Sequence, residues 1–155
     1  MKKGMYPANG IRSSWIFQAN PAKYRIEESL AVEKEELWNL NQHASRVHTG
    51  DKVYIWISGP MAGIYAIGTV VCEPIVQPDS PVGMEYWWDK RDGARAKPRV
   101  WVRYEKTLLD RPLLKIYLEN DPGLWGMRIL RNPRGTNFNL SVAESEALEW
   151  WFGQR

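Results

Sequence analysis

A tryptophan, a hydroxyl group and two glycines lie close together in one apolar part of the sequence. Trp56 and Ser58 alternate along a β-rich run, and Gly59 and Gly63 flank the turn that follows. An indole ring stacks on a flat ligand, and a glycine backbone lets such a ligand approach closely. The pattern is typical both of a binding site for a flat ligand and of a well-packed barrel hairpin, and composition alone favours neither.

Amides, aromatic rings and cations elsewhere in the chain could also take part in binding a ligand. Gln18 and Asn20 share one face of an expected strand, and buried amides need either backbone partners or the edge of a ligand. Trp87 and Trp88 precede a basic cluster, a combination that nucleic-acid grooves use for bases and phosphates. The basic residues with a possible phosphate role are Lys90, Arg91, Arg95, Lys97, Arg99, Arg128, Arg131 and Arg134. The alternatives are tryptophans packed under a long loop and charges on a solvated surface.

Metal binding and catalysis have weaker support. His43 and His48 have no cysteine or carboxylate cluster beside them at ligand spacing, so we expect no metal and no cofactor. Cys72 falls within an expected strand, where a core position is commoner than a nucleophile. The other candidates form no recognised catalytic arrangement: Asp51, Lys52, Tyr65 and Glu73. The sequence therefore favours a binding protein over an enzyme.

Length and composition limit the class of protein. The 155 residues are predicted to form one domain, residues 1–155, and a net charge of +3 indicates a slight preference for polyanions. Nine tryptophans exceed the usual need of a core of this size, so some rings are expected to line a groove or pocket. With a single cysteine, no apolar stretch of about 20 residues and no apolar run of a signal peptide at the start, we expect no disulfide, no membrane span and a cytoplasmic location.

The hydrophobic periodicity predicts strands with a few short helices. Strands are expected at residues 15–20, 53–57, 64–71 and 100–104, and helices at 26–37 and from a capping box at Ser141 and Glu144 onward. Other expectations are an irregular lead-in at 1–13, an extension of the hairpin at 73–76, a strand or turn at 108–118, a short helix at 124–130 and a loop at 131–138. No structure is predicted for 84–98. The class is α+β with a β-barrel core.

Three motifs occur in an order that resembles the EVE domain family. They are WIFQANP at 15–21, WISGPMAGIYAIG at 56–68 and RGTNF at 134–138, and the resemblance spans nearly the whole chain. It implies a PUA-like β-barrel, related to the YTH readers of methylated adenine, that binds a modified nucleobase. EVE-like domains joined to restriction enzymes resemble readers of modified cytosine in DNA. The implied partner is therefore DNA or RNA that carries a modified base, such as 5-methylcytosine or N6-methyladenine.

The resemblance also implies site residues. Trp38 matches the position of an aromatic-cage tryptophan, and a second cage aromatic is expected between residues 84 and 101. The full set of implied ligand-binding residues is Gln18, Ala19, Asn20, Trp38, Asn39, Trp56, Ser58, Gly59, Gly63, Tyr65, Trp87, Trp88, Thr136, Asn137 and Phe138. Such a reader would flip the nucleotide out of the duplex. For this chain we also expect a monomer, and a separate nuclease or other effector as a further partner.

Two alternatives from other classes remain open at this point. PUA-like barrels of the ASCH type include proteins that act on nucleosides or RNA, which keeps an enzyme as the second hypothesis. A structural or protein-interaction module is the third, and it predicts dimers through a tryptophan patch rather than binding of nucleic acid.

Overall fold

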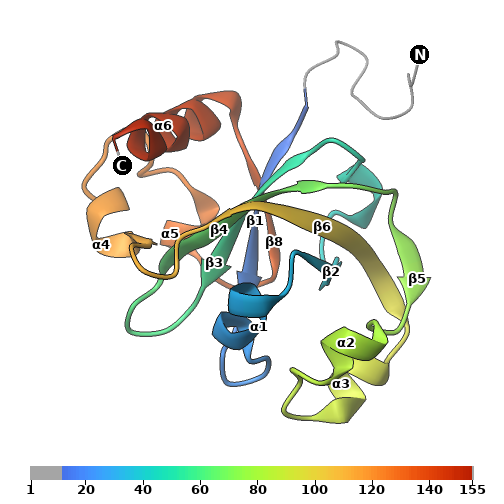
Figure 1. Ribbon diagram of the computed structural model, residues 1–155. Helices are drawn as coiled ribbons and strands as arrows, with labels where there is room; N and C mark the ends of the chain where they lie inside the picture. Colours follow the sequence, from blue (N-terminus) through green and yellow to red (C-terminus); the bar gives the residue numbers. More distant parts are fainter. Residues whose placement is uncertain (1–11, 155) are drawn as a thin grey trace.

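The computed structural model describes residues 12–154, and its centre is a curled mixed sheet that forms a half-barrel (Figure 1). The sheet order is β2-β6-β4-β3-β1-β8, with β5 paired to β6 and β7 to β4. The strands are β1 Ser14–Ala19, β2 Glu35–Asn39, β3 Lys52–Ile57, β4 Gly63–Val70, β5 Ile75–Gln77, β6 Lys97–Thr107, β7 Leu113–Leu114 and β8 Asn137–Leu140. The pair β1 and β3 is parallel and the other pairs are antiparallel. The predicted α+β class with a small barrel is confirmed.

Six short α-helices surround the sheet in the described chain. In Figure 1, α2 and α3 lie at the lower right, α4, α5 and α6 lie at the left, and α1 lies below the middle of the sheet. They are α1 Ile26–Val32, α2 Pro81–Met84, α3 Lys90–Ala94, α4 Lys115–Leu118, α5 Arg128–Arg131 and α6 Val142–Gly153. The predicted capping box is present, because Ser141 Oγ accepts from the Glu144 backbone and the Glu144 side chain accepts from the Ser141 backbone. Helix α6 packs Phe152 on Tyr54, with the ring centroids 5.7 Å apart.

Both faces of the central hairpin are buried, so Trp56 belongs to a well-packed hairpin and not to a binding site for a flat ligand. Val53, Ile55 and Ile57 belong to one apolar cluster, whereas Tyr54 and Trp56 belong to a second cluster beneath α4, α5 and α6. The predicted arms themselves are confirmed as β3 and β4. Because side chains alternate along a strand, a sheet covered on both faces buries most residues of such an arm.

The predicted helix at 26–37 is correct only in its first half. Helix α1 ends at Val32, and β2 begins at Glu35 and pairs with β6, with Trp38 opposite Val100. The glutamates of this segment resemble a solvated helix surface in the sequence. Pairing with β6 and burial of Glu36 and Trp38 outweigh that local preference.

Other boundaries moved for the same reason, because long-range pairing defines them. The expected extension of the hairpin at 73–76 is wrong, since β5 pairs with β6 as a separate strand. The predicted loop at 131–138 ends early, because β8 begins at Asn137 and pairs with β1. The predicted short helix at 124–130 lies a few residues further along the chain, as α5, Arg128–Arg131. Of the predicted lead-in at 1–13, residues 1–11 lie outside the described residues.

A close approach of two backbones fixes Gly63 at the start of β4. A Cβ atom at this position would lie 2.5 Å from the Leu113 carbonyl oxygen and 2.7 Å from the Leu114 Cα atom. Both are backbone atoms of β7, so neither can rotate away. The glycine is required for strand pairing, not for approach of a ligand.

We therefore predict that Gly63→Ala lowers the free energy of unfolding by about 1–3 kcal/mol, as overpacking does. The matched control is Gly153→Ala at the end of α6, where a Cβ atom would meet nothing within 4 Å. Alanine there is expected to leave stability unchanged or to raise it by up to about 1 kcal/mol. Urea denaturation of both variants measures the difference, and equal midpoints would contradict the assignment.

Candidate functional site

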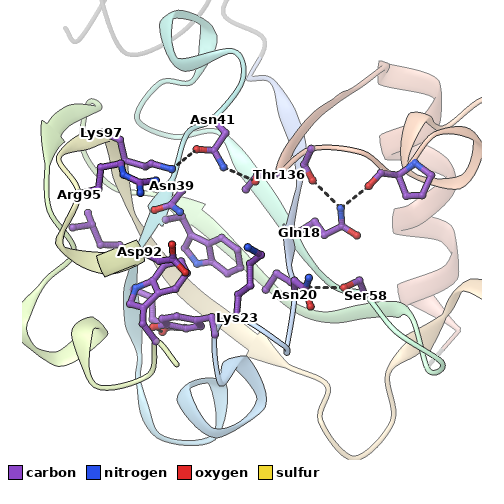
Figure 2. Close-up of a pocket in the computed structure, with 18 residues that line it drawn as sticks. Gln18, Asn20, Lys23, Asn39, Asn41, Ser58, Asp92, Arg95, Lys97 and Thr136 are labelled. Atoms are coloured by element: carbon purple, nitrogen blue, oxygen red, sulfur yellow. Dashed lines mark hydrogen bonds between the residues drawn. The ribbon is translucent and has the colours of Figure 1, made fainter. Parts of the chain in front are cut away.

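A cavity of about 600 Å³ opens where β1 and β2 end and the segments around residues 87–97 and 133–136 meet them (Figure 2). Ten of the sequence-predicted residues line it: Gln18, Ala19, Asn20, Trp38, Asn39, Ser58, Trp87, Arg95, Lys97 and Thr136. Residues far apart in the chain thus converge on one hollow with a polar rim. We call this hollow the amide pocket.

The amide pocket has three aromatic residues in its lining. Trp38 is 7% exposed, and its Nε1–H donates to the Tyr104 hydroxyl oxygen at 2.8 Å. Trp87 donates its Nε1–H to Asp79 Oδ2 at 2.6 Å and meets the Tyr24 ring edge to face, with centroids 4.9 Å apart. Each indole is therefore held by a hydrogen bond behind it, and the rings need little ordering when a flat ligand enters.

Glycine at position 93 completes the support of Trp87. A Cβ atom there would lie 2.5 Å from Trp87 Cδ1 and 2.6 Å from Met84 Sδ. Only a residue without a side chain lets α3 pack this closely against the indole. The position of this pocket wall thus depends on one glycine outside the pocket.

A buried carboxylate, Glu36, joins the aromatic residues into one network. Glu36 accepts from the Tyr24 hydroxyl at 2.5 Å, from the Tyr104 hydroxyl at 2.6 Å and from the Ser29 hydroxyl at 2.9 Å. Burial raises the pKa of the Glu36 carboxyl above its usual 4.5, although the three hydroxyls oppose this shift. Burial also raises the pKa of Tyr24 and of Tyr104, so both hydroxyls remain protonated donors.

Hydrogen bonds set the orientation of two amides on the pocket rim. Both N–H groups of Gln18 are used, because Nε2 donates to the Pro133 carbonyl at 2.9 Å and to the Gly135 carbonyl at 2.8 Å. The oxygen of Asn39 accepts from the guanidinium of buried Arg99. Gln18 therefore retains an acceptor, Oε1, and Asn39 retains its N–H donors.

Other polar groups of the rim are also ordered. The oxygen of Asn20 accepts from the Ala22 backbone at 2.9 Å, which leaves the Asn20 amide as a donor. Asn41 accepts from Lys97 Nζ at 2.9 Å and donates to Thr136 Oγ1 at 2.7 Å, as Figure 2 shows. The pocket rim thus retains one acceptor on Gln18 and donor amides on Asn20 and Asn39.

Several predicted ligand residues do not line the amide pocket. Trp56, Tyr65 and Phe138 are buried in the two cores. Gly59, at a φ of 123°, forms the exposed hairpin turn, and Gly63 contacts β7. Two others also lie outside the lining: Trp88 and Asn137. The motif residues Trp56, Tyr65 and Phe138 build the barrel and do not face the hollow.

The side chain of Asn137, in β8, is hydrogen-bonded to the backbone at and after the end of β2. Its Oδ1 accepts from the backbone of Asn41 at 2.8 Å and of Gln42 at 3.2 Å, and its Nδ2 donates to the Asn39 carbonyl at 3.0 Å. These bonds hold the end of β2 against β8. Asn137 therefore positions pocket residues without lining the pocket itself.

The predicted phosphate-contacting cations are in different situations. Arg99 is fully buried, where it bonds to backbone carbonyls and lies 4.0 Å from Asp79, so its predicted phosphate contact is wrong. Lys90 Nζ is bonded to three carbonyl oxygens nearby, and Arg91 pairs with Asp89. The remaining cations comprise two in the pocket lining, Arg95 and Lys97, and three exposed toward the C-terminal end, Arg128, Arg131 and Arg134.

Sequence reasoning missed eight lining residues: Lys23, Tyr24, Glu36, Leu37, Asn41, Asp92, Pro133 and Gly135. Glu36 was missed because the sequence predicts a helix over 26–37, in which this glutamate would lie on the solvated surface. A signal was available in the apolar neighbours Leu37 and Trp38, since a glutamate within a buried strand must have partners. Lys23 adds a cation that Figure 2 places at the pocket beside Asn20.

The described residues 12–154 contain no group of three or more His, Cys, Asp or Glu side chains that is suited to hold a metal ion. Within the same residues, no helix is long and apolar enough to cross a membrane. A second hollow of about 420 Å³ lies beside α4 and α6. Its lining is Arg111, Pro112, Leu114, Tyr117, Trp151 and Gln154.

The raised pKa of Glu36 predicts a pH effect on stability. Since the folded state binds this proton more tightly than the unfolded chain, the contribution is fully present below the usual pKa of 4.5 and is lost as pH rises through the folded pKa. The unaltered protein should therefore lose stability relative to Glu36→Gln from about pH 4.5 upward. Urea unfolding of both proteins at several pH values tests this, and other carboxyls cancel in the difference. A constant difference across pH would contradict the prediction.

Solved structures with the same fold have diverged strongly in sequence. A hypothetical protein from Leishmania major matches with a TM-score of 0.68 at 20% identity, over 94% of this chain and 98% of that one. A domain of human thymocyte nuclear protein 1 matches with a TM-score of 0.67 at 16% identity, over 92% and 100%. Human THYN1 protein in complex with DNA that contains 5-methylcytosine matches with a TM-score of 0.63 at 16% identity, over 88% and 95%. These likenesses establish the fold.

A sequence search among curated proteins finds no significant match. The family model described as EVE domain, in contrast, matches residues 13–150, which include every strand and most of α6. The sequence motifs, the curled sheet with its short helices and this match agree, and the chain belongs to the EVE domain family.

Proposed function

We propose that this protein binds a modified nucleobase of a nucleic acid in the amide pocket. The observation that carries the proposal is the set of aromatic rings and amides fixed around one hollow, with Trp38 and Trp87 held from behind. Family membership supports it, and so does the human neighbour in complex with DNA that contains 5-methylcytosine. A base inside a duplex cannot enter such a pocket, so the nucleotide is flipped out, at a cost of about a few kcal/mol.

The fixed amides favour a modified cytosine. A cytosine edge has one donor group and two acceptors, which match the Gln18 oxygen and the donors of Asn20 and Asn39. The corresponding edge of adenine has one donor and one acceptor, so one donor amide would lack a partner. A buried methyl group adds only about 0.8 kcal/mol, so selectivity for the modification requires close fit around it. We therefore expect 5-methylcytosine to bind better than N6-methyladenine.

Cations around the pocket supply the attraction to phosphates. Lys23, Arg95 and Lys97 all contribute to the lining, with Asp92 as a nearby opposite charge. Burial, followed by the charges of Arg99 and Arg95, lowers the pKa of Lys97, as expected for a cation in a positive environment. Each phosphate contact adds salt dependence to binding. We propose that the protein binds as a monomer and presents the bound strand to a separate effector such as a nuclease.

Catalysis has less support in this pocket. Glu36 is the buried carboxylate of the lining, and its two oxygens already accept hydrogen bonds from Tyr24, Tyr104 and Ser29. A general base needs a lone pair directed at the substrate proton. Glu36 thus acts as a structural anchor, and a binding role fits the pocket better than the alternative of an enzyme that acts on a nucleoside.

The first test is a titration with short single strands that carry cytosine, 5-methylcytosine, 5-hydroxymethylcytosine or N6-methyladenine, in DNA and RNA, followed by tryptophan fluorescence at two salt concentrations. We predict selective, salt-sensitive binding of a modified cytosine. Trp38→Ala should weaken it by about ten- to a hundredfold through loss of stacking, about 1–3 kcal/mol per base. Trp150→Ala, an exposed tryptophan on α6, is the control. Circular dichroism checks that Trp38→Ala is folded. Equal weak binding of every strand would overturn the proposal.

A second variant tests the pocket wall without removing a ring. Gly93→Ala should displace Trp87 and weaken binding of the preferred base by about tenfold, because the new methyl group occupies the space of the indole edge. Gly126→Ala is the matched control, since its Cβ atom would meet nothing nearer than 3.7 Å. Fluorescence titration of both variants measures the effect. Unchanged affinity in a folded Gly93→Ala protein would exclude Trp87 as a contact surface.

A further inference from the structure

Trp88 lies outside the amide pocket, and its ring is both exposed and fixed. The residue is 62% exposed and lies in the sequence between α2 and α3. Its Nε1–H donates to the Pro21 carbonyl at 3.1 Å, and its backbone N–H donates to the Lys23 carbonyl at 3.0 Å. An exposed tryptophan usually keeps its rotamer freedom, but here the bond to Pro21 restricts the side chain. The bond to Lys23 holds the backbone of Trp88 against the segment after β1.

A cation lies against the same ring. The Arg25 guanidinium carbon is 5.3 Å from the Trp88 ring centroid and 5.8 Å from that of Tyr86. Arg25 is itself held, because it donates to Glu28 Oε2 at 3.0 Å and to the Glu85 carbonyl oxygen. The result is an ordered stack of Tyr86, Arg25 and Trp88 in which the indole still exposes most of its surface. An aromatic ring supported in this way is a stacking surface for a further flat group.

The position of Trp88 next to the pocket indicates what that flat group is. Trp87, the preceding residue, lines the amide pocket, and consecutive Cα atoms are only about 3.8 Å apart. The segment to which Trp88 bonds also borders the pocket, through Asn20 and Lys23. A nucleotide that places its base in the pocket therefore brings its neighbour in the same strand near this indole.

We propose that Trp88 is a second stacking site, which binds the base next to the modified one in the same strand. This inference rests on the proposed function of the amide pocket and adds to it. The ligand is then a dinucleotide unit of a nucleic-acid strand, with one base inside the pocket and one on the outer ring. The bonds of Trp88 to Pro21 and Lys23 hold the two surfaces in one arrangement before binding.

The test compares a DNA trinucleotide with central 5-methylcytosine and free 5-methyl-2′-deoxycytidine, by fluorescence titration or calorimetry. Trp88→Ala should weaken binding of the trinucleotide by about ten- to a hundredfold and leave the free nucleoside unchanged, since loss of one stacked base has this size. Trp88→Phe should restore most of the affinity. Trp150→Ala, 59% exposed on α6, is the matched control and should change neither ligand. An abasic nucleotide on one side of the modified base should reproduce the loss with the unaltered protein.

Each outcome decides between the two proposals. If Trp88→Ala binds the trinucleotide as well as the unaltered protein does, the second stacking site is wrong and the pocket proposal stands. If Trp88→Ala weakens the free nucleoside equally, Trp88 supports the pocket and is no separate site. If the unaltered protein binds neither ligand, both proposals fail. Intact folding of Trp88→Ala, checked by circular dichroism, is expected because the side chain is exposed.

Discussion

A buried carboxylate and the hydroxyls around it hold the site together. Glu36 loses its hydration in the folded protein, which costs several kcal/mol unless hydrogen bonds replace the lost water. The replacements come from different parts of the chain: Ser29 in α1, Tyr24 before it and Tyr104 in β6. Tyr104 in turn accepts from Trp38. The aromatic lining, the first helix and two strands therefore share one electrostatic anchor, and none of them can shift without leaving a buried oxygen or hydroxyl unpaired.

A second buried ion supports the other side of the pocket. Arg99 donates hydrogen bonds to backbone carbonyls of the segment around α3 and to the side-chain oxygen of Asn39. The nearby carboxylate of Asp79 accepts a hydrogen bond from the indole N–H of Trp87. Both groups are buried, so their charges and hydrogen bonds act in a low dielectric, where geometry is strictly enforced. Short helices such as α2 and α3 have little stability of their own. These buried polar contacts give their connecting segment a defined position beside the sheet.

Preorganisation is the property that these two anchors give to the site. Rings that are already held from behind lose little entropy on binding, so more of the stacking energy appears as affinity. The same logic extends outside the hollow, where Arg25 and the Pro21 carbonyl hold Trp88 in an exposed position. Flipping a nucleotide out of the stack costs about a few kcal/mol. Stacking of bases on fixed rings inside and beside the pocket offsets this cost.

The sequence by itself determined the fold class, the central hairpin, the capping box of the last helix and the family, because these depend on local alternation, turn residues and contiguous motifs. It also pointed to Gln18, Trp38 and Thr136 in the pocket. Only the tertiary structure decided that Trp56 is core, that Arg99 is buried and that Glu36 belongs to a strand. The reason is the same in each case. Strand pairing across the chain and burial on both faces of a sheet depend on distant partners, and no local pattern in the sequence contains that information.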